Sequence, residues 1–207
     1  MTSELPWKML LLGGGAGAGK STCAEAIASR EGVSWIDVDG IWLALKRATT
    51  PASHPAFHYF EPAERDLVLG AEALYGRHIE TAVAVSNALD MTVAHYLATG
   101  HRAVVEGAWI TPEFASRRAF GLVEAGRGVR AIFIHEHDEA EVLSAMQDRR
   151  NGGRPGTLPP TPRQLIITRV CWLYGNWIRD EASRLGLPVV AARPRDTLVD
   201  RIIEAAR

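Results

Sequence analysis

The stretch Met9–Glu25, MLLLGGGAGAGKSTCAE, decides which fold this chain can adopt. It opens with a short apolar run typical of a buried strand and closes with apolar residues at helical spacing. Between them lies a segment that satisfies the pattern Gly, four residues, Gly, Lys, then Ser or Thr. Its members are Gly14, Gly15, Ala16, Gly17, Ala18, Gly19, Lys20 and Ser21. Because a strand precedes it and a helix follows it, the segment is predicted to form a phosphate-binding loop, or P-loop.

Each position of this loop has a physical role. Glycine and alanine leave no bulky side chain in the way, so successive backbone N–H groups can turn inward around polyphosphate oxygens. We expect Lys20 to reach the outer phosphates and the Ser21 hydroxyl to ligate the accompanying Mg²⁺. The helix predicted from Lys20 to Arg30 contains Thr22 among the nucleotide-binding residues and points its positive end at the same anion. ATP and Mg²⁺ are the expected cofactors; a flexible Gly/Ala-rich turn that matches by chance is the alternative.

The composition is that of one globular α/β domain over residues 1–207. The chain has a formal net charge of -1 and 47% hydrophobic residues, which suits one large core and excludes a disordered chain. The charge carries no signal for a nucleic-acid partner. No apolar run approaches the ~20 residues of a membrane span, and no signal-type segment is evident, so we expect a cytoplasmic protein without a membrane partner. Oligomeric state is not indicated.

Strands and helices alternate along the chain. Short apolar runs predict five strands, at Lys8–Leu12, Val33–Val38, Arg102–Glu106, Val129–Ile134 and Leu187–Ala191. Helical periodicity follows in 79–97, 163–185 and 196–207, whereas the Pro- and His-rich residues 49–62 indicate a loop. This alternation predicts a parallel sheet wrapped by helices, with the ligand at the strand ends. Residues 41–100 exceed a single crossover, and we assign them to a helical substrate-binding insertion.

Carboxylates follow two of the predicted strands. Asp37 and Asp39 stand in IDVDG, and period-two alternation would point both to one face beside the P-loop. We assign Mg²⁺-bound water to Asp37, nearer the sheet, and alignment of an attacking hydroxyl to Asp39. Glu106 ends the third strand and is a candidate for metal water or a substrate hydroxyl. Capping of a helix that starts near Ile41 is the alternative for the aspartates, and a solvated turn is the alternative for Glu106.

An arginine-bearing segment follows the fourth strand and its helix. Residues 148–156, DRRNGGRPG, predict a mobile lid over 149–161 that supplies cations to the migrating phosphoryl group and excludes water. Arg149 is the catalytic candidate, and Arg149 and Arg154 are candidate nucleotide contacts; a solvated loop is the alternative. The run HEHD at 135–138 lacks further ligands at defined spacing and reads as a strand exit. Trp42 and Trp109 are candidate pocket walls.

The P-loop, IDVDG, VVEGAWITP and the arginine-bearing segment, in this order, resemble the small-molecule P-loop kinases of the nucleoside-monophosphate-kinase type. This resemblance implies a five-stranded sheet in the order 2-3-1-4-5. The run LYGRHIETAVAVSNALDMTVAHYLATGHRAVVEGAWITP, with HDEAEVLSAMQDRR and IITRVCWLYGNWIRDEASRLGLPVV, is similar to the 2-phosphoglycerate kinase branch. IDVDG is also similar to the paired-aspartate strand end of shikimate and gluconate kinases.

Two departures from the phosphoglycerate branch bear on the substrate. That branch tends to have Ile-Arg where this chain has Ile41-Trp42, so Trp42 becomes a substrate candidate, and Lys46 and Arg47 become the candidate anion-binding residues. It tends to have Gln where this chain has Glu80. A neutral hydroxyl compound therefore fits as well as an acidic one.

We expect an ATP-dependent phosphotransferase that acts on a hydroxyl of a small metabolite. In this prediction, Lys20, Asp39 and Arg149 are catalytic, and the acceptor is held by Asp39, Glu106, Trp42 and Arg47. A P-loop ATPase that works as a nucleotide-dependent switch or partner-coupled motor is the alternative. The chain has no Asn-Lys-x-Asp stretch, which would read guanine, and no strand that ends in an Asp-Glu pair.

Overall fold

The computed structural model describes residues 6–59, 64–126, 128–150 and 159–207. Its central sheet consists of β1 (Met9–Gly14), β2 (Ser34–Asp37), β3 (Ala103–Glu106), β6 (Val129–His135) and β7 (Val189–Ala191). The strand order is β2-β3-β1-β6-β7, and every neighbouring pair is parallel. Counting only these five strands, this is the order 2-3-1-4-5. The predicted α/β class, the five strands and their order are confirmed.

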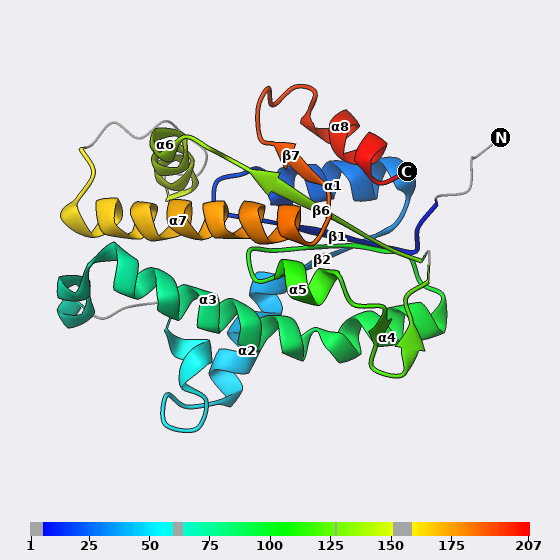
Figure 1. Cartoon of the computed structure of the whole chain (residues 1–207), viewed down its shortest axis with the longest axis horizontal. Coiled ribbons are helices and arrows are strands. Elements are labelled where there is room, and N and C mark those ends of the chain that lie inside the picture. Colours follow the sequence, from blue (N-terminus) through cyan, green and yellow to red (C-terminus); the bar gives the residue numbers. More distant parts are fainter. Residues whose placement is uncertain (1–5, 60–63, 127, 151–158) are drawn as a thin grey trace.

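The buried strands divide the core into two layers. Successive side chains of a strand point to opposite faces, so Met9 and Leu11 of β1 pack on one side, and Leu10 and Leu12 on the other. The side of Leu10 is covered by α1 (Lys20–Glu31) and α8 (Leu198–Ala205). The opposite side is covered by α3 (Gly70–Ala88), α4 (Asp90–Thr99), α5 (Pro112–Ala115) and α7 (Pro162–Arg184) (Figure 1).

Residues 41–100 are mainly helical in the part that the structure describes. They contain most of α2 (Val38–Ala48), the 3-10 turns η1 (Pro55–His58) and η2 (Glu64–Leu69), and then α3 and α4. The predicted loop at 49–62 contains one short 3-10 turn, and residues 60–62 of it lie outside the described residues. The Trp42 indole donates to the Phe57 carbonyl at 2.9 Å, and the Thr81 hydroxyl donates to the Ala56 carbonyl at 2.7 Å. These bonds fasten α2 and the loop to α3.

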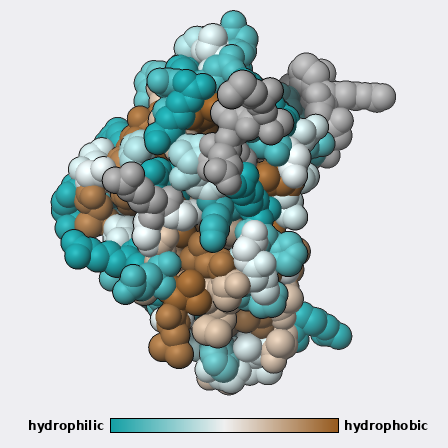
Figure 2. Space-filling view, turned by 90° about the vertical axis from the view of Figure 1, so that its right-hand side faces the viewer, coloured by the Kyte–Doolittle hydropathy of each residue, from teal (hydrophilic) through white to brown (hydrophobic). Residues whose placement is uncertain are grey.

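A short antiparallel pair, β4 (Ala119–Phe120) with β5 (Val123–Glu124), was not predicted. Two-residue strands are too short for periodicity to reveal them. Met91 and Leu122 are exposed in this region. Figure 2, which shows the right-hand side of the molecule in Figure 1, has apolar residues among polar ones on its lower half. The remaining helix, α6 (Glu139–Arg150), leads from β6 toward α7. Among the described residues, no helix has the length and apolar character needed to cross a membrane.

Candidate active site

The P-loop connects β1 to α1 with a backbone that only glycine adopts readily. Gly14 has φ 140° and Gly19 has φ 94°, both in the region that L side chains rarely enter. A Cβ on Gly14 would also lie 2.2 Å from the Ile134 carbonyl oxygen. Gly19 is the N-cap of α1 and offers no side-chain cap, so the first N–H groups of this helix keep their capacity to bind an anion.

The P-loop also lies close to α7. A Cβ on Gly15 would lie 3.0 Å from the Cα of Gly175, and a Cβ on Gly175 would lie 3.6 Å from the Cα of Gly15. The P-loop and the middle of this helix therefore approach backbone to backbone.

Lys20 begins α1 and is buried. Its Nζ donates to the Gly15 carbonyl at 2.8 Å, within the P-loop itself. Burial lowers the pKa of Lys20, and the nearby carboxylates of Glu106 and Asp39 oppose that change. The ammonium group thus stands between the loop and two negative side chains.

Glu106 is the deeply buried carboxylate of the site, with 2% of its surface exposed. It ends β3 and is in register with Asp37 at the end of β2. Burial raises the pKa of Glu106, whereas the Lys20 charge and a side-chain hydrogen bond with Ser21 lower it. Glu106 is therefore not the solvated turn residue of the alternative interpretation; it lies inside the site beside the P-loop serine.

The predicted strand alternation, which would point Asp37 and Asp39 to one face, is wrong because the strand ends at Asp37. The helix predicted near Ile41 begins at Val38, with Asp37 as its N-cap. The Asp37 carboxylate accepts from the Asp39 backbone N–H at 2.8 Å, so Asp37 caps α2, and its role toward Mg²⁺-bound water stays a prediction. Asp39 lies in the first turn of α2, and helical geometry does not keep its side chain on the same face as that of Asp37.

The surroundings of the Asp39 carboxyl act on its pKa in both directions. Although the residue stays accessible to solvent, partial removal of the carboxyl from water is the main cause that raises its pKa, and the Asp37 charge adds to it. Three interactions lower the pKa of Asp39: the Lys20 charge, a side-chain hydrogen bond with Trp109, and the Arg149 charge. A carboxyl with a raised pKa is suited to accept a proton.

One pocket of about 130 Å³ brings seven of the predicted site residues together, whereas the P-loop residues Gly14, Gly15, Gly17, Ala18 and Gly19 are outside its lining. Its lining consists of Ala16, Lys20, Ser21, Asp39, Trp42, His78, Glu106, Gly107, Ala108, Trp109, Arg149 and Cys171. Arg149 reaches it from the end of α6. Asp37, Arg47 and Thr22 are not in this lining: Asp37 caps α2, Arg47 is exposed in the last turn of α2, and Thr22 is exposed in the first turn of α1. Of the predicted lid, Arg154 lies outside the described residues.

Aromatic rings form part of the pocket's lining. Trp42 and Trp109, the expected pocket walls, have ring centroids 5.2 Å apart. His78 lies 5.0 Å from the Trp109 ring and 4.3 Å from the Tyr174 ring. Burial lowers the pKa of His78 to about 3, so this imidazole is uncharged at neutral pH. Sequence reasoning missed His78 because a single histidine on a helix carries no motif.

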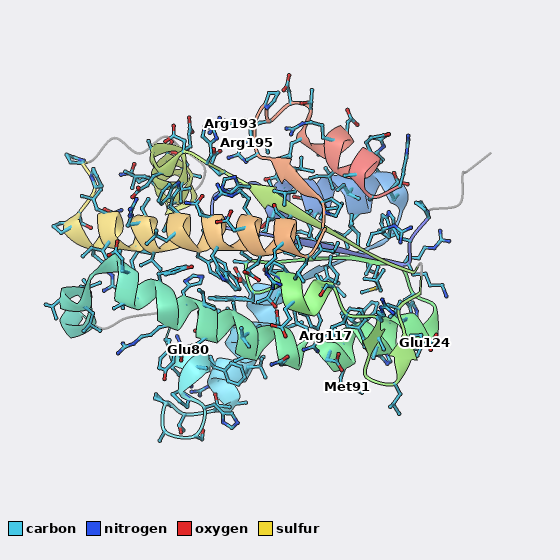
Figure 3. All side chains as sticks on the ribbon, viewed as in Figure 1. Glu80, Met91, Arg117, Glu124, Arg193 and Arg195 are labelled. Carbon is cyan, nitrogen blue, oxygen red and sulfur yellow. The ribbon has the colours of Figure 1, made fainter. Side chains whose placement is uncertain are left out.

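The P-loop also has a support on its outer side. Arg195, in the loop after β7, donates to the carbonyl oxygens of Ala18 at 2.7 Å and Gly17 at 2.8 Å. Its guanidinium lies 3.5 Å from the carboxylate of Glu136, to which Arg193 donates at 3.1 Å. Figure 3 shows the two arginines next to each other beside β7. Glu136, the buried member of the HEHD run, thus serves an ion-pair network.

Comparisons with known proteins agree with this architecture. No protein-family model matches the chain. The bifunctional pantoate ligase/cytidylate kinase of Synechococcus sp. (strain CC9902) is 30% identical over 153 residues, which is 68% of this chain and 31% of that protein. The chain therefore spans about a third of the length of this curated relative.

Two solved structures share the fold over nearly the whole chain. A gluconokinase from Sinorhizobium meliloti 1021 has a TM-score of 0.51 at 15% identity and covers 98% of this chain and 93% of its own. A provisionally assigned kinase from Chloroflexus aurantiacus j-10-fl has a TM-score of 0.52 at 15% identity and covers 98% and 94%. At this level of identity the likeness concerns the fold, and the chain has the P-loop kinase fold that the resemblance implied.

Proposed function

We propose that this protein is an ATP-dependent phosphotransferase that moves the γ-phosphoryl group to a hydroxyl of a small molecule. The observation that carries the proposal is the shared pocket of Lys20 and Ser21 with Asp39 and Glu106. A nucleotide-driven switch needs no site for a small-molecule acceptor, whereas a kinase needs a polar acceptor site next to the γ-phosphate. The gluconokinase fold and the cytidylate kinase named in the curated relative support the same reaction class.

The P-loop side of the pocket would hold the nucleotide. Lys20 would exchange its bond to the Gly15 carbonyl for the outer phosphates, next to the inward-facing N–H groups of the loop. Ser21 and Glu106 both line the pocket, and their side-chain oxygens are of the kind that bind Mg²⁺. The Asp37 charge raises the pKa of both Glu106 and Asp39. Asp37 is the proposed contact for water bound to the Mg²⁺ ion. The bound ion would offset negative charge on the phosphates.

Asp39 is the proposed proton acceptor. The acceptor oxygen forms a bond to the γ-phosphorus while the bond from that phosphorus to the β–γ bridging oxygen breaks, and ADP leaves. The hydroxyl proton passes to the Asp39 carboxylate, whose raised pKa favours this transfer. Arg149 would offset charge on the migrating group from the end of α6.

The 41–100 segment is the proposed acceptor-binding part. It supplies Trp42 from α2 and His78 from α3 to the pocket lining, and Asp39 lies just before it. An assay with the whole chain, ATP and a panel of hydroxylated metabolites, followed by mass spectrometry, tests the function. Gain of one phosphoryl group by an acceptor supports it. Hydrolysis that needs no acceptor and rises with a protein partner would favour the switch instead.

A further inference from the structure

The acceptor side of the pocket carries negative charge. Asp39 and Glu106 both line the pocket, and the charge of Asp39 raises the pKa of Glu106. Among the described lining residues, the cations are Lys20 and Arg149. Lys20 belongs to the P-loop and is bonded to the Gly15 carbonyl, and in the proposed function both cations serve the phosphates of ATP. The described lining thus offers no further cation for an anionic group on the acceptor.

The two candidate anion-binding residues of the sequence lie elsewhere. Lys46 has its Nζ over the Trp42 ring, 5.3 Å from the ring centroid, and is not part of the lining. Arg47 is exposed in the last turn of α2 and is also outside the lining. Neither Lys46 nor Arg47 therefore adds a positive charge to the described lining.

The aromatic wall is held in a fixed arrangement. Trp42 donates its indole N–H to the Phe57 carbonyl at 2.9 Å, and its ring meets that of Trp109 at 44°. The His78 ring meets that of Trp109 at 31°. Rings that cannot rotate freely lose little entropy when a flat apolar group packs on them.

We propose that the acceptor is an alcohol without a carboxylate or phosphate of its own, which packs an apolar or planar face against Trp42 and Trp109. This inference rests on the proposed function and names its substrate class. Beside Asp39 an acceptor anion would be repelled by a like charge, and the cations of the described lining, Lys20 and Arg149, serve the phosphates of ATP in the proposed function. A neutral alcohol meets no such cost. Gluconate, shikimate and 2-phosphoglycerate, which all carry carboxylates, fall outside this class.

A matched pair of probes tests the inference. 3-Phenyllactamide and 3-phenyllactate share the hydroxyl and the ring and differ only in the amide or carboxylate. Isothermal titration calorimetry with the whole chain, Mg²⁺ and a non-hydrolysable ATP analogue gives both affinities. We expect the amide to bind about tenfold more tightly, because a negative charge next to the Asp39 carboxylate is disfavoured. Asp39→Asn should narrow this difference in affinity severalfold by removing the repelling charge.

Tryptophan variants test the aromatic face. Trp42→Ala should weaken amide binding about tenfold, while Trp42→Phe, which keeps a ring, should stay within a few fold. Trp35→Ala is the matched control, since Trp35 lies on β2 outside the lining and is exposed. If Trp42→Ala does not fold, Trp42→Phe and Asp39→Asn still decide the matter.

Several results would overturn the inference. Equal or tighter binding of phenyllactate would refute the charge argument, and failure of both probes to bind in the millimolar range would refute the apolar face. Efficient ATP-dependent phosphorylation of carboxylated alcohols would end the inference and leave the kinase function intact. Tight binding of the amide without phosphoryl transfer to any acceptor would instead end the proposed function and leave the pocket's preference standing.

Discussion

Arg195 donates a hydrogen bond to the carbonyl oxygen of Ala18 at 2.7 Å, across 177 positions of sequence. The same guanidinium donates to the Gly17 carbonyl and lies against the buried Glu136. When the carbonyl oxygens of a loop are held outward, its N–H groups can converge on the inner side, as an anion-binding nest requires. The loop after β7 thus keeps the P-loop in the shape that binds phosphate.

Arg195→Ala should weaken ATP binding more than it slows turnover at saturating ATP. Charge-assisted hydrogen bonds are strong, but Arg195 is partly exposed, so we expect about a tenfold loss of ATP affinity. Titration calorimetry with a non-hydrolysable analogue measures it. Arg184→Ala removes an exposed arginine that pairs with Glu181 and should leave the affinity unchanged. A similar loss in both variants would contradict a specific role for Arg195.

Lys20→Ala should reduce phosphoryl transfer by roughly a thousandfold, because the variant loses charge stabilisation that grows in the transition state. Lys8→Ala, an exposed lysine in the segment before β1, is the control. Rates of acceptor-dependent ADP release for both variants decide the outcome. Near-wild-type turnover of Lys20→Ala would refute the assignment of the P-loop.

Asp39→Asn should keep ATP·Mg²⁺ affinity and lose acceptor turnover by roughly a hundredfold, the scale expected when a proton acceptor is removed. Because the pKa of Asp39 is raised, wild-type turnover should fall as the pH drops through that raised value. A pH–rate profile together with ATP titration provides the measurement. Normal turnover of the variant would leave Glu106 as the candidate acceptor of the proton.

Substitutions at Asp37 can separate its cap from a metal role. Asparagine is a good N-cap, so Asp37→Asn should keep the stability of the chain and weaken the Mg²⁺ dependence of turnover. Asp37→Ala should in addition lower the free energy of unfolding by about 1 kcal/mol. Urea unfolding and a Mg²⁺ titration distinguish the two effects. An unchanged Mg²⁺ dependence in Asp37→Asn would limit Asp37 to capping.

His78 should make the folded protein sensitive to mild acid. Its pKa falls from an ordinary 6.5 to about 3 on folding, so between these values the unfolded chain binds a proton that the folded chain does not. Stability is therefore lost as the pH falls below 6.5, by about 1.4 kcal/mol per pH unit. His78→Phe should show a flatter dependence of unfolding free energy on pH between 6 and 4. Parallel curves for the two proteins would be inconsistent with a buried, neutral His78.

The parts of this site that could be predicted from sequence are those determined by local backbone geometry. The P-loop glycines, Lys20 and the strand before them form one continuous motif, and short apolar runs reveal buried strands. The direction of Asp39 could not be predicted because it depends on where α2 begins, which the Asp37 cap decides. His78 and Arg195 reach the site through tertiary packing, from a helix and a loop that carry no motif.

The close approach of Gly15 and Gly175 makes the two glycines differ in how they would accept a Cβ. Glycine in the interior of a 23-residue helix such as α7 costs roughly 0.5–1 kcal/mol relative to alanine, so Gly175→Ala would favour the helix. The added methyl group would also occupy the gap that separates α7 from the P-loop, at 3.6 Å from Gly15. Because 3.6 Å is an ordinary van der Waals contact, alanine would be accommodated at position 175, whereas a Cβ on Gly15 would lie 3.0 Å from the Gly175 Cα and would require the P-loop or α7 to shift.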